Sequence, residues 1–270
     1  MATLFPRTGL VVVTGASAGI GFEFARQLAE RGHSLLLVAR RRERLESAVA
    51  ELRNRYRVDA QARVVDLADS AQLESFASDL SRLEPTLLVN NAGFGTIGFL
   101  HKTDVDDQIK MHNLHVLATL RLTCAVLPKQ IERDQGGVIN VSSIAAFFSG
   151  PGNVSYCATK AWMNSFTEGT HIELQSLGSN VRVQALCPGY TRSEFHQTMG
   201  VSTAGIPTRL WLSAEYVVRT SLRDLDNNRW LAIPGLHYRT FVALRRFVPP
   251  SLIHRLATRS AKRFRSENFR

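Results

Sequence analysis

The chain has 270 residues, of which 44% are apolar and 21% charged, and its formal net charge is +10. These proportions are typical of one soluble globular domain and exclude a disordered or fibrous protein. No apolar run reaches the ~18 residues of a membrane span, and the chain's start lacks the pattern of a secretion signal. Cys124, Cys157 and Cys187 show neither disulfide nor metal-ligand spacing. We therefore expect a cytoplasmic protein with reduced thiols.

Short aliphatic runs alternate with segments of helical spacing along the chain. The runs expected to be strands buried on both faces cover 10–13, 34–39, 62–65, 87–90, 138–141 and 181–186. The segments expected to be helices cover 20–31, 42–54, 70–83, 113–132 and 155–177. This alternation predicts a doubly wound α/β fold, with a parallel sheet and ligands at the carboxyl ends of its strands.

A glycine-rich turn, T-G-A-S-A-G-I-G at 14–21, follows the first predicted strand. Gly15, Gly19 and Gly21 allow a tight turn, close approach of the backbone to a pyrophosphate, and close packing of the following helix. A glycine cluster by itself also fits a flexible loop. Its position between a buried strand and an amphipathic helix favours a dinucleotide site.

Three arginines, Arg40, Arg41 and Arg42, follow the second predicted strand. In a dinucleotide fold an acidic residue at this tip binds a free ribose 2′-hydroxyl, whereas an arginine suits a 2′-phosphate. With no acidic residue at the tip, Arg40 favours NADP over NAD. Arg41 and Arg42 fit equally well as the solvated start of the next helix.

Tyr156 and Lys160 are four residues apart in a predicted helix and therefore share one face. An ammonium beside a phenol favours the phenolate, so we expect the pKa of Tyr156 to fall below about 10. This spacing alone is common on helix surfaces. The pair becomes informative in combination with Ser143, thirteen residues before Tyr156.

Over residues 8–236 the sequence resembles the short-chain dehydrogenase/reductase family. The markers are the glycine turn, Asp66-Leu67, N-N-A-G at 90–93, Asn113, Ser143, Y-x-x-x-K at 156–160 and Pro188-Gly189. The resemblance implies a Rossmann-like seven-stranded sheet, whose last strand covers 229–234, and a catalytic tetrad of Asn113, Ser143, Tyr156 and Lys160. It also implies that residues 1–236 form the NAD(P)-binding domain.

The resemblance assigns a role to each member of the tetrad. Tyr156 would exchange a proton with the substrate oxygen as hydride moves to or from the nicotinamide. Ser143 would stabilise charge on that oxygen, and Lys160 would hold the nicotinamide ribose. Asn113 would anchor a water that links Lys160 to solvent. Ser142 is adjacent to Ser143, but only one of the two can face the substrate, and the family's spacing favours Ser143.

Further cofactor contacts follow from the same resemblance: Ser17, Ile20, Asp66, Leu67, Asn90, Ala92, Gly93, Pro188, Gly189 and Thr191. Asp66 fits equally well as a cap of the loop before residue 70. The N-N-A-G stretch could also be only a turn. His112 and His115 are expected to be surface or packing residues, and no metal site is expected.

The segment between Pro188 and Ser213 combines polar and apolar residues and suits a lid. Seven side chains could line an apolar pocket or lie in the core: Phe94, Phe147, Phe148, Phe195, Met199, Leu210 and Trp211. A lipophilic ketone or alcohol, of the 3-oxoacyl or steroid type, is the expected substrate class.

The extension at 237–270 has nine Lys or Arg residues and one acidic residue, Glu267, and so carries +8 of the net charge. From Leu252 onward a helical projection separates an apolar arc from a basic one. The apolar arc comprises Leu252, Ile253, Leu256, Ala257 and Phe264, and the basic arc Arg255, Arg259, Lys262 and Arg263. We expect the apolar arc to pack on the body or on a second subunit. Peripheral contact with an anionic membrane is the alternative, and nucleic-acid binding is not expected.

The predicted function is an NADP-dependent oxidoreductase that interconverts a carbonyl and an alcohol, in a homo-oligomer, either a dimer or a tetramer. The alternative is a protein of the same fold that binds NADP as a sensor or scaffold with little turnover. The short length disfavours an epimerase or dehydratase of the extended relatives.

Overall fold

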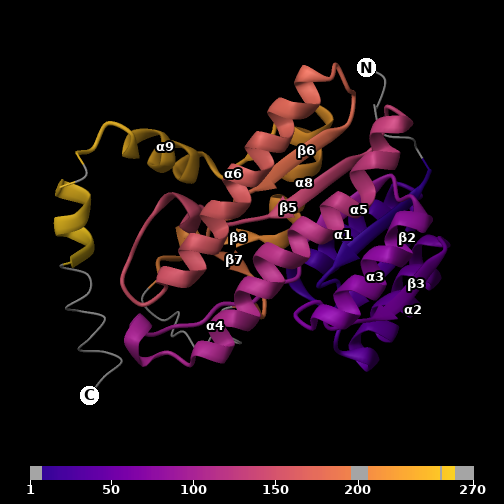
Figure 1. Ribbon diagram of the computed structural model, residues 1–270, viewed down its shortest axis with the longest axis horizontal. Helices are drawn as coiled ribbons and strands as arrows, with labels where there is room; N and C mark the ends of the chain where they lie inside the picture. The colour runs from indigo at the N-terminus through magenta and orange to yellow at the C-terminus, as the bar shows by residue number, and fades with distance from the viewer. Residues whose placement is uncertain (1–7, 196–205, 250, 259–270) are drawn as a thin grey trace.

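The computed structural model describes residues 8–195, 206–249 and 251–258, and it has a parallel sheet at its centre (Figure 1). The sheet has seven strands in the order β3-β2-β1-β4-β5-β6-β9. Their bounds are β1 Leu10–Thr14, β2 Ser34–Ala39, β3 Ala60–Val64, β4 Leu87–Asn90, β5 Gly137–Val141, β6 Arg182–Leu186 and β9 Leu231–Ala232. The chain order reverses between β1 and β4, and ligands of doubly wound folds bind at such a reversal.

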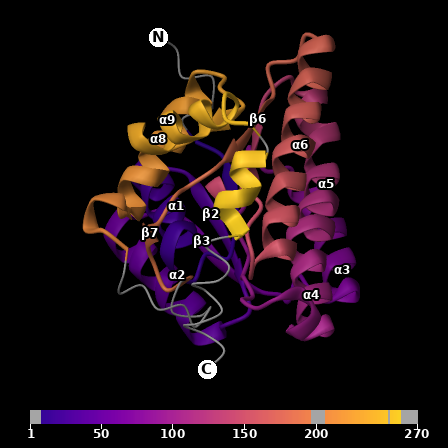
Figure 2. The same ribbon diagram turned by 90° about the vertical axis from the view of Figure 1, so that its left-hand side faces the viewer.

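Helices cover both faces of the sheet, as Figure 2 shows with α5 and α6 on one side and α1 and α8 on the other. One layer consists of α1 Gly19–Glu30, α2 Arg42–Tyr56 and α8 Ala214–Asp226. The other consists of α3 Ser70–Leu83, α5 Ala118–Glu132 and α6 Val154–Ser176. Val11 and Val13 of β1 pack under the first layer, and Val12 packs under the second. Burial on both faces explains why the strands are aliphatic without alternation.

The structure differs from the sequence expectation in several connecting elements. The predicted helix at 113–132 begins earlier, as α4 Val105–His112, and passes through a π-helical turn, Asn113–Leu117, into α5. The last strand is β9, shorter than the predicted 229–234. Unpredicted elements are the small β7 Thr191–Arg192 and β8 Leu212–Ser213 pair, α8, α9 Leu236–Arg245, and 3-10 turns at Leu100–Lys102, Ile144–Phe147 and Thr208–Leu210.

Helix α9 is joined to the body through Tyr238. Its hydroxyl donates to the Leu210 carbonyl at 2.7 Å and accepts from the Tyr190 amide at 3.1 Å. Its ring lies so close to Gly189 that a Cβ there would come within 2.1 Å of it. The beginning of the predicted extension is therefore part of the packed structure beside the Pro188-Gly189 turn.

Residues 251–258 form a further helical segment, as predicted from Leu252 onward. Leu252 and Leu256 of the apolar arc are 46% and 54% exposed, so these two do not pack on the body, and packing on a second subunit stays a prediction. Phe264, Arg259, Lys262 and Arg263 lie outside the described residues, as does Met199 of the predicted lid. Within the described ranges, every helix is too short or too polar to cross a lipid bilayer.

Candidate active site

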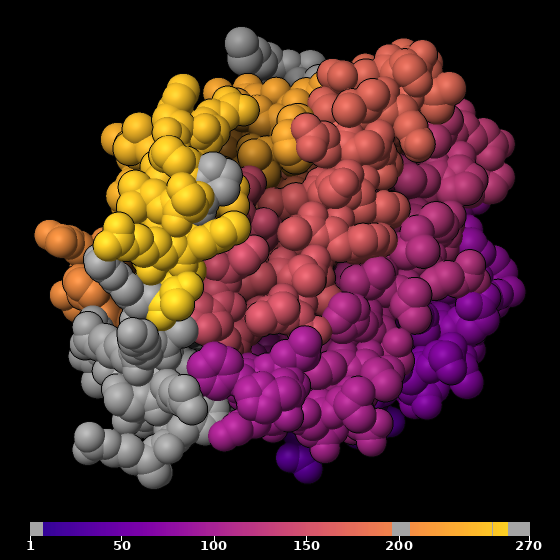
Figure 3. All heavy atoms as spheres, turned by 60° about the vertical axis from the view of Figure 1, so that its left-hand side comes forward, coloured from indigo at the N-terminus to yellow at the C-terminus, as the bar shows by residue number. Residues whose placement is uncertain are grey.

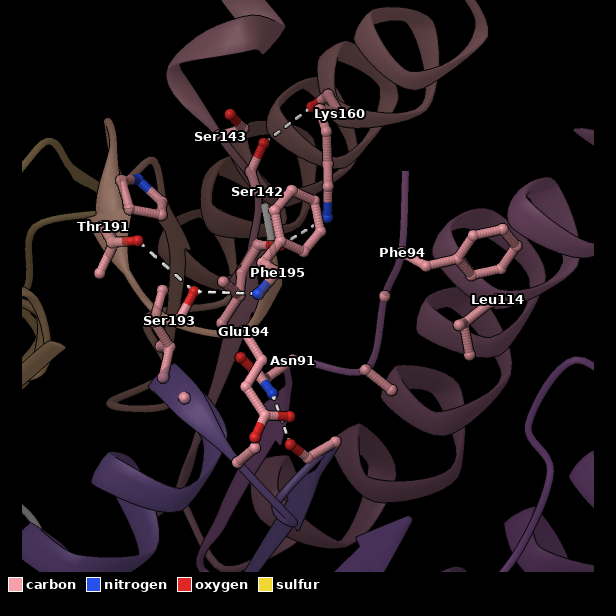
Figure 4. A pocket seen from close by; sticks show the side chains of 18 of the residues that line it. Asn91, Phe94, Leu114, Ser142, Ser143, Lys160, Thr191, Ser193, Glu194 and Phe195 are labelled. Atoms are coloured by element: carbon pink, nitrogen blue, oxygen red, sulfur yellow. Dashed lines mark hydrogen bonds between the residues drawn. The ribbon is translucent and has the colours of Figure 1, made fainter. Parts of the chain in front are cut away.

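A cavity of about 690 Å³ opens at the carboxyl ends of the central strands, between the glycine turn and the start of α6. Figure 4 shows Phe94 and Leu114 on one side of it and Thr191 and Ser193 on the other. Most of the predicted cofactor residues line this cavity: Gly15, Ser17, Gly19, Ile20, Arg40, Asp66, Leu67, Ala92, Gly93, Pro188, Gly189 and Thr191.

The glycine turn after β1 is shaped to receive an anion. Gly15 and Gly19 have φ values of +65° and +58°, which L side chains rarely adopt. A Cβ on Gly21 would come within 2.4 Å of the Gly15 carbonyl oxygen, so this glycine is needed for packing. Helices α3, α4 and α8 have side-chain caps, whereas α1 begins at Ala18 without one. The first amides of α1 are therefore available to the phosphates of a dinucleotide.

The two asparagines of the N-N-A-G stretch have different hydrogen-bond partners. Asn90 was predicted to contact the cofactor, but its side chain is buried and donates to Asn140 Oδ1 at 2.9 Å and Thr123 Oγ1 at 3.2 Å. Asn91 lines the cavity and donates to the carbonyls of Thr14 and Gly15 at 2.9 and 3.2 Å. Asn90 thus joins β4 to its neighbours, and Asn91 braces the glycine turn.

Asp66 serves the loop and also lies at the cavity. Its Oδ1 accepts a hydrogen bond from the Ala68 amide at 3.0 Å, while the cap of α3 itself is Asp69. Arg40 lies 3.6 Å from the Asp66 carboxylate. Arg41 donates to Ser17 Oγ of the glycine turn at 3.1 Å. Two arginines therefore line the cavity directly after β2.

Tyr156 and Lys160 lie buried on one face of α6, as their spacing predicts. The Lys160 ammonium nitrogen lies 5.8 Å from the centre of the Tyr156 ring and donates to the Val141 carbonyl at 2.8 Å. This contact ties α6 to the end of β5. The centre of the Phe195 ring lies 6.0 Å from that of Tyr156.

The expectation that the pKa of Tyr156 falls is wrong. Burial raises the pKa of Tyr156 to about 12, against a smaller opposing effect of its hydrogen bond with Ser143. Burial also lowers the pKa of Lys160 to about 7. Both groups lose water, which disfavours their charged forms, and the weakened lysine charge cannot offset that loss at the phenol.

The two adjacent serines at the end of β5 point in different directions. Ser142 is buried and donates to the Lys160 main-chain oxygen at 2.9 Å. Ser143 begins the turn Ile144–Phe147, where its Oγ accepts from the Ala145 amide at 3.1 Å, and its side chain opposes the rise in the pKa of Tyr156. Ser143 is therefore the serine positioned to act together with the tyrosine.

Asn113 lies at the start of the π-helical turn rather than on the cavity wall. Its Nδ2 donates to the Ala68 carbonyl at 3.4 Å, and its carbonyl accepts from the Ala118 amide. The α-helical geometry of α4 changes to a π-helical turn at Asn113, and π-helical turns are frequent at functional sites.

The two histidines that flank Asn113 differ in environment. His112 is exposed and bonds to Ser155 Oγ at 2.8 Å. His115 is buried, bonds to Thr159 Oγ1 at 2.9 Å and packs edge-on against the Tyr156 ring. Burial holds the pKa of His115 well below its usual value. The two residues are thus a surface and a packing residue, as predicted.

Of the seven apolar candidates for the pocket, Phe94, Phe148 and Phe195 line the cavity. Phe147 packs with the small cluster around Ile233, and Trp211 lies against Tyr190. The structure adds wall residues that the sequence reasoning missed: Ile97, Leu114, Ile144, Asn153, Tyr190, Ser193 and Glu194. Ser193 could have been found from its place five residues after Pro188, but nothing local to the sequence indicates Glu194.

The fold and this site define a class of nicotinamide-dependent oxidoreductases. A profile of the short chain dehydrogenase family matches residues 9–202, and the chain belongs to this short-chain dehydrogenase/reductase family. It is 34% identical over 199 residues to a very-long-chain 3-oxoacyl-CoA reductase of Anas platyrhynchos, with 72% of this chain and 63% of that protein covered. The chain therefore spans less than two thirds of the length of that relative.

Two solved structures are similar over nearly the whole chain. A short-chain dehydrogenase from Sphingobium yanoikuyae, in complex with NADPH, is 30% identical with a TM-score of 0.80, covering 97% of this chain and 96% of that one. The bulky-bulky ketone specific alcohol dehydrogenase from Comamonas testosteroni is 26% identical with a TM-score of 0.76, covering 97% and 95%.

Proposed function

We propose that the protein is an NADPH-dependent carbonyl reductase acting on a lipophilic ketone. The observation that carries this proposal is the composition of one continuous cavity. Tyr156, Ser143 and Lys160 lie at one end, and Arg40 and Arg41 lie at the other. NADPH, when bound, supplies the hydride. The uncapped start of α1 and the glycine turn fit its pyrophosphate, and the arginines fit its 2′-phosphate.

The protonation of the buried groups is compatible with reduction of a carbonyl. With a pKa of about 12, Tyr156 is a protonated phenol at neutral pH and can donate its proton to a carbonyl oxygen. Ser143, which lines the cavity together with Tyr156, would donate to that oxygen as negative charge develops on it. A lysine whose pKa is about 7 exchanges protons readily near neutrality, so Lys160 can restore the tyrosine proton.

The substrate end of the cavity supports a lipophilic substrate. Phe94, Ile97, Leu114, Phe148 and Phe195 provide apolar walls beside Tyr156. Aromatic and aliphatic walls favour an apolar body with one polar reacting group. The names of the relatives, a very-long-chain 3-oxoacyl-CoA reductase and a bulky-ketone dehydrogenase, agree with a 3-oxoacyl or steroid-like ketone.

The surface of the C-terminal helices supports peripheral contact with an anionic membrane. Leu244 and Phe247 are 57% and 79% exposed, next to Arg245 and Arg246. Figure 3 shows the C-terminal part of the chain, in yellow, on the surface of the molecule. The Phe241 ring stacks at 4.8 Å on Phe148 of the cavity wall, so lipid contact at α9 would lie close to the substrate end.

We also propose a homo-oligomer, because Leu117 and Ile172 expose apolar side chains around α5 and α6. Light scattering of the purified protein tests this proposal, and a monomer at micromolar concentration would contradict it.

The reductase proposal is tested by following NADPH oxidation at 340 nm with 3-oxoacyl thioesters, ketosteroids, retinal and small diketones. Turnover that is lost in Tyr156→Phe supports the reductase. Tight NADPH binding without turnover on the whole panel would favour the sensor or scaffold alternative instead.

A further inference from the structure

An ion-pair cluster lies at the end of the cavity where the adenosine of the cofactor is proposed to bind. Two of its members, Arg41 and Arg44, lie at the start of α2, and the third, Glu194, follows the small strand β7. Glu194 lies 2.7 Å from Arg44 Nη1 and 3.1 Å from Arg41 Nη1. Arg41 reaches on to Ser17 of the glycine turn. One carboxylate thus forms ion pairs with two guanidinium groups beside the predicted phosphate site.

A carboxylate and a phosphate monoester bind arginine in the same way, because both accept hydrogen bonds from its planar N–H donors through anionic oxygens. The phosphate carries more charge, about −1.5 to −2 at neutral pH. If the 2′-phosphate of NADPH binds at the tip of β2, it meets Arg41 already paired with Glu194. The two anions cannot share the guanidinium without repulsion.

We propose that the Glu194 carboxylate competes with the 2′-phosphate of NADPH for Arg41 and Arg44, and thereby limits how strongly the protein selects NADPH over NADH. This inference rests on the proposed function. NADH has no 2′-phosphate and leaves both ion pairs intact, whereas NADPH must break or reorient them. Glu194 is a specificity-determining residue that acts through the arginines.

Phe195, the residue after Glu194, links this competition to the end of the cavity that contains Tyr156. Phe195 follows Glu194 directly, and its ring lies against Tyr156 at 6.0 Å. Figure 4 shows Glu194 and Phe195 among the residues that line the pocket. The same short stretch therefore contacts both ends of the cavity, and displacement of Glu194 releases one of these two contacts.

The test uses two fragments of the cofactor, 2′,5′-ADP and 5′-AMP, which differ only in the 2′-phosphate. Their binding to the full-length protein is measured by isothermal titration calorimetry. Glu194→Gln keeps the shape of the side chain and removes its charge. Glu46→Gln is the matched control, because exposed Glu46 pairs with Arg42 on the same helix but not with Arg41 or Arg44. Thermal melts verify that both variants are folded.

We expect Glu194→Gln to bind 2′,5′-ADP about three- to tenfold more tightly than the wild type, the range for releasing two exposed ion pairs. Its affinity for 5′-AMP should be unchanged, and Glu46→Gln should match the wild type. The gain should shrink at high salt, which screens exposed charges.

The outcomes separate this inference from the proposed function. A wild type that prefers 2′,5′-ADP, combined with a Glu194→Gln variant of equal or weaker affinity, would overturn the competition and leave the NADPH proposal standing. A preference that emerges only in Glu194→Gln supports the competition and contradicts NADPH use by the wild type. No preference in either protein overturns both proposals.

Discussion

The Ser142 hydroxyl donates a hydrogen bond to the main-chain oxygen of Lys160 at 2.9 Å. This bond joins the end of β5 to helix α6, which carries Tyr156 and Lys160. The adjacent Ser143 lines the cavity together with Tyr156. Two neighbouring serines therefore have separate tasks, one structural and one chemical.

This division predicts different effects of alanine at the two positions. Ser143→Ala should lower kcat by about 10²–10³, the loss typical of one donor to a developing oxyanion. Ser142→Ala should retain kcat within about threefold and lose about 1 kcal/mol of stability with its hydrogen bond. Steady-state kinetics and urea unfolding of both variants check the pair. Equal kinetic losses would contradict the assignment.

Tyr156→Phe should abolish turnover and leave NADPH binding nearly unchanged, because the phenol transfers a proton but does not hold the dinucleotide. Lys160→Ala should damage both turnover and binding. Fluorescence titration with NADPH, run beside the activity assay, separates the two effects. Full activity in the phenylalanine variant would refute the mechanism.

Replacing Lys160 by Met should stabilise the cofactor-free protein at neutral pH. The folded-state pKa of about 7 lies below the ordinary 10.5, so the unfolded chain binds more protons between these values. Wild-type stability attributable to this lysine therefore rises with pH across that interval. At about 1.4 kcal/mol per pKa unit, less the lost bond to Val141, we expect a gain of about 3 kcal/mol at pH 7.

The gain of Lys160→Met should shrink steadily toward pH 9.5, because the free energy needed to release the lysine proton on folding falls as the pH approaches the unfolded pKa of 10.5. Urea unfolding of both proteins from pH 6 to 9.5 measures it. A difference that is constant with pH, or a destabilised variant at pH 7, would show that Lys160 is not desolvated as described.

NADPH should bind at least tenfold more tightly than NADH, because Arg40 and Arg41 stand at the ribose end of the cavity. Arg40→Asp should erase or reverse this preference by placing a carboxylate beside the 2′-position. Titrations of each protein with both cofactors measure the ratio. Equal binding of NADH and NADPH by the wild type would refute the phosphate assignment.

The protein should sediment with anionic vesicles and not with neutral ones, more weakly at high salt. The double variant Leu244→Glu/Phe247→Glu should lose this binding and keep its activity on a water-soluble ketone. Leu177→Glu is a control, since Leu177 is 66% exposed at the end of α6 and lies outside the proposed surface. A folded wild type that does not sediment with anionic vesicles would contradict the membrane proposal.

The sequence by itself determined the features that depend on local periodicity. The bounds of β2 Ser34–Ala39, β4 Leu87–Asn90 and α3 Ser70–Leu83 agree with the prediction. A strand buried on both faces is a short aliphatic run, and a helix has apolar residues at helical spacing, so both can be recognised within a few consecutive residues. The same holds for the glycine turn and for the shared face of Tyr156 and Lys160. The family pattern was readable because each of its markers is short and local.

Tertiary structure decided whatever depends on depth of burial or on distant partners. Asn90 turns into the core because Thr123 and Asn140 lie beside it, on other elements. The pKa of Tyr156 rises because the folded chain removes its water, a loss that spacing along a helix cannot reveal. Glu194 meets Arg44, 150 residues earlier, only through folding. No local pattern encodes such a pair, so the charge at the adenosine end of the cavity had to be seen in three dimensions.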